Sequence, residues 1–149
     1  MHNLKCSTEL VFPYKMMNIL GDKRNLKYFR IHESGDFYSE DYVKKWYEIA
    51  RALPAVTFYA YTKRNDIFTK ELLEEKPSNF KLTWSIDGLH DYLDVNVDSF
   101  EKVLKYYDNV AVVTTNANNC INQTDKTKKC MIDCTKCAES GNFIVFKEH

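Results

Sequence analysis

An alternation of strand-like and helix-like segments between residues 27 and 114 most constrains the fold of this chain. Runs rich in aromatic and β-branched residues are typical of strands, and they occupy 27–32, 56–61, 81–86 and 110–114. Segments with apolar residues at helical spacing lie between these runs, at about 39–53, about 66–75 and from Asp98 onward. Strands joined by helices form parallel crossovers, so this order predicts a mostly parallel sheet covered by helices.

The number of such units narrows the architecture further. About four βα units are too few for a closed eight-stranded barrel. We therefore predict an α/β fold with an open, mostly parallel sheet or a partial barrel. After Thr114 the chain becomes polar and then cysteine-rich, before a short terminal strand at 142–146. We divide the chain into an N-terminal extension (1–26), a βα-repeat core (27–115) and a Cys-rich, metal-binding tail packed on that core (116–149).

Length and charge set the broad class of protein. The chain has 149 residues, which suits one domain. Its 21 basic and 21 acidic residues cancel, which argues against broad, charge-driven binding of nucleic acid. No apolar run approaches the length of a membrane span, and the first residues lack the apolar core of a secretory signal. We therefore expect a cytoplasmic protein with no membrane partner.

Four of the five cysteines gather in the tail, at Cys120, Cys130, Cys134 and Cys137. Nine, three and two residues separate them in turn. Thiolates two to four residues apart can point at one metal without straining the backbone, and the longer loop can bring in Cys120 as a fourth ligand. In a chain that is not exported, such a cluster favours metal binding over a disulfide framework.

Cysteine spacing leaves the metal open. Four thiolates hold either zinc or an iron–sulfur cluster. Disulfides and unliganded thiols are the alternatives. A four-sulfur site has no open position for a substrate, so we expect it to fix the tail rather than to perform chemistry. Four nearby lysines would offset the thiolate charge, or else bind RNA around the loop: Lys126, Lys128, Lys129 and Lys136.

Polar residues follow the predicted strands at the edge where parallel α/β proteins bind ligands. Acid, base and hydroxyl groups meeting there could bind a charged small molecule or exchange protons. Strand ends are also polar simply because they meet water. The residues of this predicted rim are His32, Ser34, Asp36, Tyr61, Lys63 and Asp87. Tyr38, Tyr42 and Tyr47 cannot all face inward from one helix, which suggests an aromatic contact surface.

Two blocks, HESGDFYS at 32–39 and FYAYTK at 58–63, resemble an uncharacterised family of phage and mobile-element proteins, the gene-product-88-like family. The resemblance runs from about residue 26 to 140 and includes Ser85-Ile86-Asp87 and the Cys-rich segment. Full-length relatives are longer at the front, where they carry further cysteines. Their strand-end motifs resemble those of radical enzymes built on a partial barrel and an iron–sulfur cluster.

This resemblance implies three functional hypotheses. A shortened mobile-element protein suggests a non-enzymatic anti-CRISPR inhibitor, acting in the cytoplasm of a bacterial host by stoichiometric contact with a CRISPR effector nuclease. The first alternative is an iron–sulfur-containing enzyme or small-molecule binder that uses the strand-end rim. The second alternative is an RNA-binding protein. We expect the first hypothesis to hold, and the protein not to be an enzyme.

Overall fold

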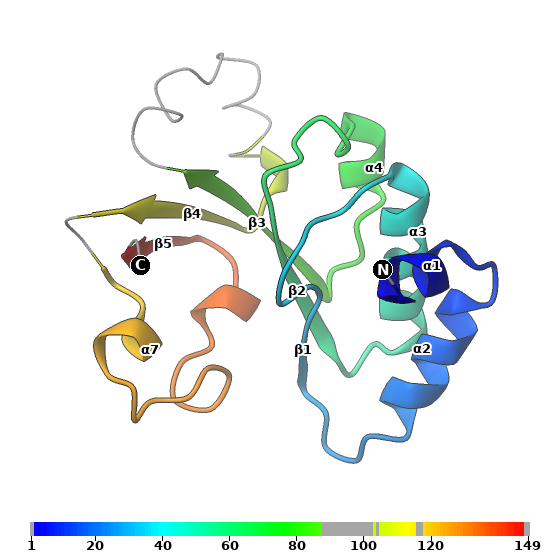
Figure 1. Cartoon of the computed structure of the whole chain (residues 1–149), viewed down its shortest axis with the longest axis horizontal. Coiled ribbons are helices and arrows are strands. Elements are labelled where there is room, and N and C mark those ends of the chain that lie inside the picture. Colours follow the sequence, from blue (N-terminus) through cyan, green and yellow to red (C-terminus); the bar gives the residue numbers. More distant parts are fainter. Residues whose placement is uncertain (1, 88–102, 104, 116–117, 148–149) are drawn as a thin grey trace.

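The computed structural model describes residues 2–87, 103, 105–115 and 118–147 (Figure 1). The segment expected to be irregular (88–97) and most of the helix expected from Asp98 lie outside this range. Elements within it follow this order: α1 (His2–Thr8), α2 (Phe12–Gly21), β1 (Tyr28–Arg30), α3 (Glu40–Ala52), β2 (Thr57–Thr62), α4 (Lys70–Glu74), β3 (Phe80–Asp87), β4 (Asn109–Thr114), α7 (Ile121–Thr124), the 3-10 turn η1 (Lys136–Ala138) and β5 (Asn142–Lys147).

All five strands are parallel and follow one another across the sheet in the order β1-β2-β3-β4-β5. The sheet curls into a half-barrel, with its helices on one side and the Cys-rich tail on the other (Figure 1). This confirms the α/β fold with an open parallel sheet or partial barrel. The terminal strand predicted at 142–146 is its fifth member, paired with β4. No helix among the described residues is long and apolar enough to span a membrane.

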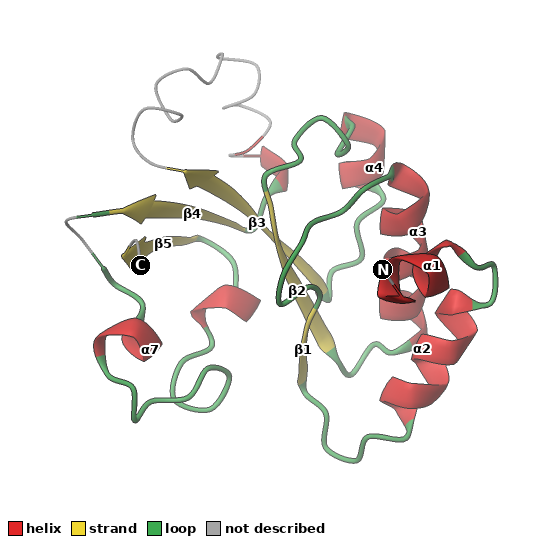
Figure 2. Cartoon of the chain, in the orientation of Figure 1, coloured by secondary structure: helices red, strands yellow, loops and turns green. Residues whose placement is uncertain are grey.

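The two faces of the sheet differ because successive residues of a strand point to opposite sides. Phe58 and Ala60 of β2 are fully buried in the hydrophobic core on the side of α3, which we call the helix face. Tyr59 and Tyr61 alternate with them and point to the opposite side, the tail face. There η1 lies against β2, β3 and β5. Figure 2 shows the red helices α1 to α4 gathered beyond the helix face.

Helix α3 begins and ends where local chemistry sets its bounds. The Ser39 Oγ accepts a hydrogen bond from the Tyr42 backbone N–H at 3.2 Å, as an N-cap does. At the other end, the Asn79 side-chain amide donates to the carbonyl oxygens of Ala50, Leu53 and Val56. One side chain thus satisfies carbonyls that a helix end leaves without partners.

The aromatic contact surface expected from Tyr38, Tyr42 and Tyr47 is wrong. Tyr42 and Tyr47 are buried in the core. Tyr38 stacks on Tyr42, with ring centroids 4.5 Å apart, and its hydroxyl bonds Ser7 at 2.9 Å. The sequence argument failed because the N-terminal helices cover a side of α3 that would otherwise face water.

Residues 2–26 of the N-terminal segment form a second helical layer on α3. Phe12 contacts Trp46 edge-on, with ring centroids 5.6 Å apart. The buried Lys45 ammonium donates to the carbonyl oxygens of Ser7 and Thr8, both at 3.3 Å, and so caps the end of α1. This segment therefore contributes to the core rather than extending away from it.

Asp108 joins the tail to the sheet at the amino-terminal end of β4. Its carboxylate accepts hydrogen bonds from the Lys76 ammonium at 2.7 Å, the Leu82 backbone N–H at 2.9 Å and the Ser140 hydroxyl at 2.8 Å. Lys81 is a further ion-pair partner at 3.3 Å. Burial opposes ionisation, but Lys76 and the hydrogen bonds outweigh it, so the pKa of Asp108 lies below its usual range.

Candidate functional site

A cavity of about 580 Å³ lies between the tail face of the sheet and the Cys-rich tail. Its sheet side comes from residues that alternate with the core residues of the same strands. These are Arg30, Tyr59, Tyr61, Ser85 and Phe146, with Glu33 from the loop after β1. The tail supplies the other side with Cys120, Asn122, Gln123, Lys126, Cys130, Met131 and Cys137. The size is that of a small-molecule site.

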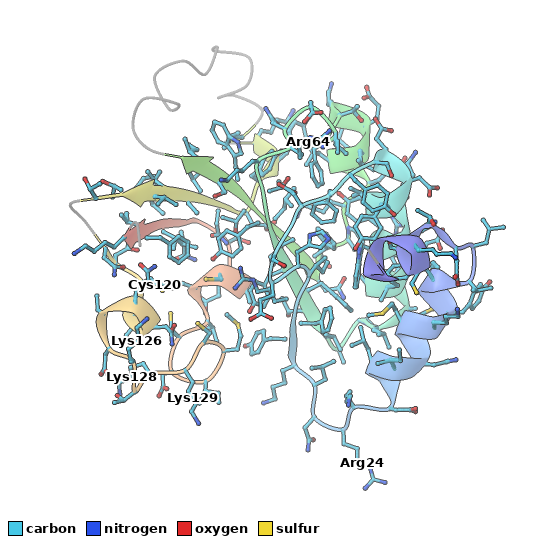
Figure 3. The ribbon with its side chains drawn as sticks, viewed as in Figure 1. Arg24, Arg64, Cys120, Lys126, Lys128 and Lys129 are labelled. Atoms are coloured by element: carbon cyan, nitrogen blue, oxygen red, sulfur yellow. The ribbon has the colours of Figure 1, made fainter. Side chains whose placement is uncertain are left out.

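Local structure of the tail places three of its four thiols, Cys120, Cys130 and Cys137, around this cavity. Cys120 immediately precedes α7, and Cys137 lies in η1. Cys130 and Cys134 are paired by a backbone bridge, in a tight turn where the Met131 N–H donates to the Cys134 carbonyl at 2.8 Å. None of the four thiols forms a disulfide. Figure 3 shows Cys120 and the labelled tail lysines on the same side of the molecule.

The thiols lie near enough to one another to interact electrostatically. Burial raises the pKa of Cys130, and the charges of Cys120 and Cys134 raise it further. Burial also raises the pKa of Cys137; contact with Tyr61 opposes this rise, and the other three thiols add to it. Each thiolate repels a second negative charge beside it and so raises the pKa of the neighbouring thiols. A bound cation would instead lower the pKa of these thiols.

Tyr61 connects the sheet to the thiols. Its hydroxyl is buried and makes no hydrogen bond of normal geometry with any described residue. It nevertheless lies against the Cys137 sulfur. Burial, and then the proximity of Cys137, raise the pKa of Tyr61 well above its ordinary value. The Cys137 sulfur is therefore the acceptor within reach of this hydroxyl.

The structure separates most of the predicted rim from this cavity, which only Tyr61 of that set lines. Asp36 instead fastens the loop after β1 to the end of β2. Its carboxylate accepts from the Thr62 hydroxyl at 2.7 Å and from the Lys63 backbone N–H at 2.8 Å. Ser34 is exposed to solvent. Asp87 ends β3, and its side chain falls outside the described residues.

His32 turns toward the helix face. Its ring contacts Phe37, with centroids 4.8 Å apart, and its Nε2 lies 3.1 Å from the Tyr42 hydroxyl. The Nδ1 is buried without a hydrogen-bond partner among the described residues. Burial lowers the pKa of His32, and the charge of Asp36 partly opposes this.

Sequence reasoning missed two residues that line the cavity from the sheet, Arg30 and Tyr59, although it placed Ser85 at a strand end. It searched the carboxyl ends of the strands, as the rule for parallel sheets suggests. The missing signal was alternation: on β2, Tyr59 and Tyr61 occupy the positions between the core residues. The alternation of residues along a strand assigns these side chains to a site only once another segment is known to cover that face of the sheet.

Comparisons with known proteins agree with the resemblance in the sequence. The family model described as "Gene product 88" matches residues 12–148. The Gene 88 protein of Mycobacterium phage D29 is 42% identical over 73 residues, which are 49% of this chain and 29% of that protein. The Gene 88 protein of Mycobacterium phage L5 is 41% identical over 69 residues, covering 46% and 28%.

These matches thus span less than a third of either relative, at 29% and 28% of their lengths. No solved structure matches the chain. The family model, by contrast, covers nearly all of it. The chain belongs to the gene product 88 family, which includes proteins encoded by mycobacteriophages.

Proposed function

We propose that this protein holds an iron–sulfur cluster in the cavity on the tail face, as a redox centre. The ligands would be Cys120, Cys130, Cys134 and Cys137. The observation that carries the proposal is that three of these thiols line one cavity of about 580 Å³, opposite the open face of a parallel half-barrel. A cluster bound there would supply one-electron chemistry next to space for a small molecule.

A cluster and a single zinc ion require different distances between the thiols. Zinc holds sulfur at about 2.3 Å, so the four sulfurs of a tetrahedral site lie about 3.8 Å apart. Within the described ranges, no three Cys, His, Asp or Glu side chains come together closely enough to bind one ion. A cluster carries its cysteines on separate iron atoms and therefore holds them farther apart.

Residues around the thiols suit a cluster's charge. Arg30 and Lys126 line the same cavity and would offset the negative charge of the thiolates. The Tyr61 hydroxyl would donate to the Cys137 sulfur, since it has no other partner among the described residues. Hydrogen bonds to ligating sulfur tune the potential of a cluster.

Protein purified without oxygen provides the test. We expect visible charge-transfer absorption together with iron and acid-labile sulfide. Cys130→Ser and Cys137→Ser should lose both, whereas Cys6→Ser is the matched control, because Cys6 lies in α1 beyond the helix face. If the protein is colourless and contains stoichiometric zinc, the cluster is rejected and the thiols form a closed structural zinc site. Equal loss in all three variants would contradict the assignment of ligands.

A second candidate is stoichiometric inhibition of a bacterial CRISPR effector nuclease through protein contact. The observation favouring it is apolar exposure in and beside α2, where Leu10 is 89% exposed and Tyr14 is 71% exposed. Apolar side chains gathered on a surface are typical of protein-binding sites.

Co-purification with candidate effector nucleases and a DNA-cleavage assay test this second candidate. A Leu10→Ser/Tyr14→Ser variant should lose both binding and inhibition. Ile132→Ser is the control, since Ile132 is also apolar and 75% exposed but lies in the tail. Failure of every effector to bind the unmodified protein would eliminate the candidate.

A further inference from the structure

We propose that the same cavity recognises the carboxylate or phosphate group of a small molecule, and that Arg30 is the residue that grips it. This goes beyond the proposed cluster, because it depends on the sheet side of the cavity and not on the metal.

Two contacts fix this guanidinium over the tail face. Its Nε donates a hydrogen bond to the His32 carbonyl oxygen at 3.1 Å. The guanidinium carbon lies 5.5 Å from the centre of the Tyr61 ring, a cation–π arrangement. His32 has a φ of 62°, a left-handed conformation that reverses the chain just after β1.

The remaining part of the guanidinium is available to a ligand. Its two terminal nitrogens make no hydrogen bond or ion pair with any described residue, although Arg30 lines the cavity. A guanidinium held by Nε and by stacking presents these nitrogens as a planar fork. Such a fork matches the paired oxygens of a carboxylate or phosphate.

Other polar groups in the cavity also lack protein partners. The hydroxyls of Tyr59 and Ser85 line it from neighbouring strands, and neither is hydrogen-bonded to another described residue. The Lys126 ammonium approaches from the tail and has no ion pair there. These groups can all donate to an anionic oxygen.

Glu33 is the one carboxylate among the residues that line the cavity, and it is exposed. Two cations, Arg30 and Lys126, line the cavity with it. Its charge should weaken the binding of an anion. Removal of the Glu33 charge should therefore tighten anion binding, whereas removal of the Arg30 charge should weaken it.

The experiment measures binding of inorganic phosphate and of acetate, in separate titrations, by calorimetry or by NMR shifts. It is run on the protein as purified and again after removal of any metal. We expect saturable binding of at least one probe in both preparations. The tighter probe identifies the class of oxyanion.

Four variants then locate the site. Arg30→Gln should weaken binding by about tenfold or more, because it removes charged hydrogen bonds. Arg30→Lys should recover only part of this loss. Glu33→Gln should tighten binding a few-fold. Arg24→Gln is the matched control, since Arg24 lies well away from Cys120 (Figure 3).

Four results would overturn the proposal. One is that neither probe binds, and another is that Arg24→Gln and Arg30→Gln weaken binding equally. The third is that Glu33→Gln weakens binding as Arg30→Gln does. Loss of binding only after metal removal would also reject it, because the oxyanion would then be a ligand of the metal. Arg30 is exposed, so its variants should remain folded.

Discussion

Replacing Asp108 with alanine should be among the most destabilising single changes in this protein. The carboxylate is 10% exposed, and its partner Lys76 is 12% exposed. Removing the carboxylate leaves the Lys76 ammonium partly buried without its charge partner. It also takes an acceptor from the Leu82 backbone N–H and the Ser140 hydroxyl. Breaking a buried pair in this way costs about 3–5 kcal/mol of unfolding free energy.

Urea denaturation followed by circular dichroism measures this loss, and Asp66→Ala is the matched control. Asp66 also pairs with a cation, Arg64, at 2.8 Å, but their side chains are 66% and 44% exposed. Solvent-exposed pairs contribute little, so this control should hardly change stability. If Asp108→Ala cost no more than Asp66→Ala, the reasoning from burial would be refuted.

The pH dependence of Asp108 has a definite sign. Its pKa in the folded protein is lowered, so the unfolded chain binds the proton more readily. The stabilisation that ionised Asp108 contributes is therefore complete at pH values above the ordinary aspartate pKa. It is lost as the pH falls through the pKa of Asp108 in the folded protein. Asp108→Asn should flatten this acid limb of the stability curve, whereas Asp66→Ala should leave most of it.

Three further predictions concern single side chains. Asn79→Ala should lower the free energy of unfolding by about 1–3 kcal/mol, because carbonyls at the end of α3 and just before β2 lose their donor; an unchanged thermal midpoint would contradict this. Gly141→Ala should cost about 1–2 kcal/mol in urea unfolding, since Gly141 has a φ of 81°, whereas Gly21→Ala, in a helix with open space around it, should cost nothing. His32 should titrate by NMR with a midpoint below 6.5, because burial disfavours its charged form; a midpoint at or above that value would refute the packing described.

Local patterns predicted the sheet well. Aromatic and β-branched runs marked all four core strands to within two or three residues, because those residues fit a pleated, covered surface. β1 is shorter than predicted, since His32 takes a left-handed conformation just beyond it. α4 is also shorter, because the Thr69 hydroxyl caps it by accepting from the Leu72 N–H at 3.2 Å. Such endings depend on single hydrogen bonds that periodicity does not register.

The candidate site was predicted mainly from its tail side, with Tyr61 as the one predicted rim residue on its sheet side. Cysteine spacing identified the thiols, because ligand spacing is a local property. Which sheet residues line the cavity depends on the face of the sheet that the tail covers. That contact belongs to the tertiary structure and leaves no local pattern in the sequence. Asp36 illustrates the same limit. It was predicted as a rim residue, but its carboxylate is occupied by Thr62 and Lys63, neighbours that only the folded chain brings together.

X-ray absorption at the metal edge of anaerobically purified protein tests the cluster most directly. The account predicts iron with sulfur neighbours and, in addition, iron neighbours at a longer distance. A lone zinc atom surrounded by four sulfurs would contradict it, and so would a metal-free protein in which all four tail thiols react with a thiol reagent.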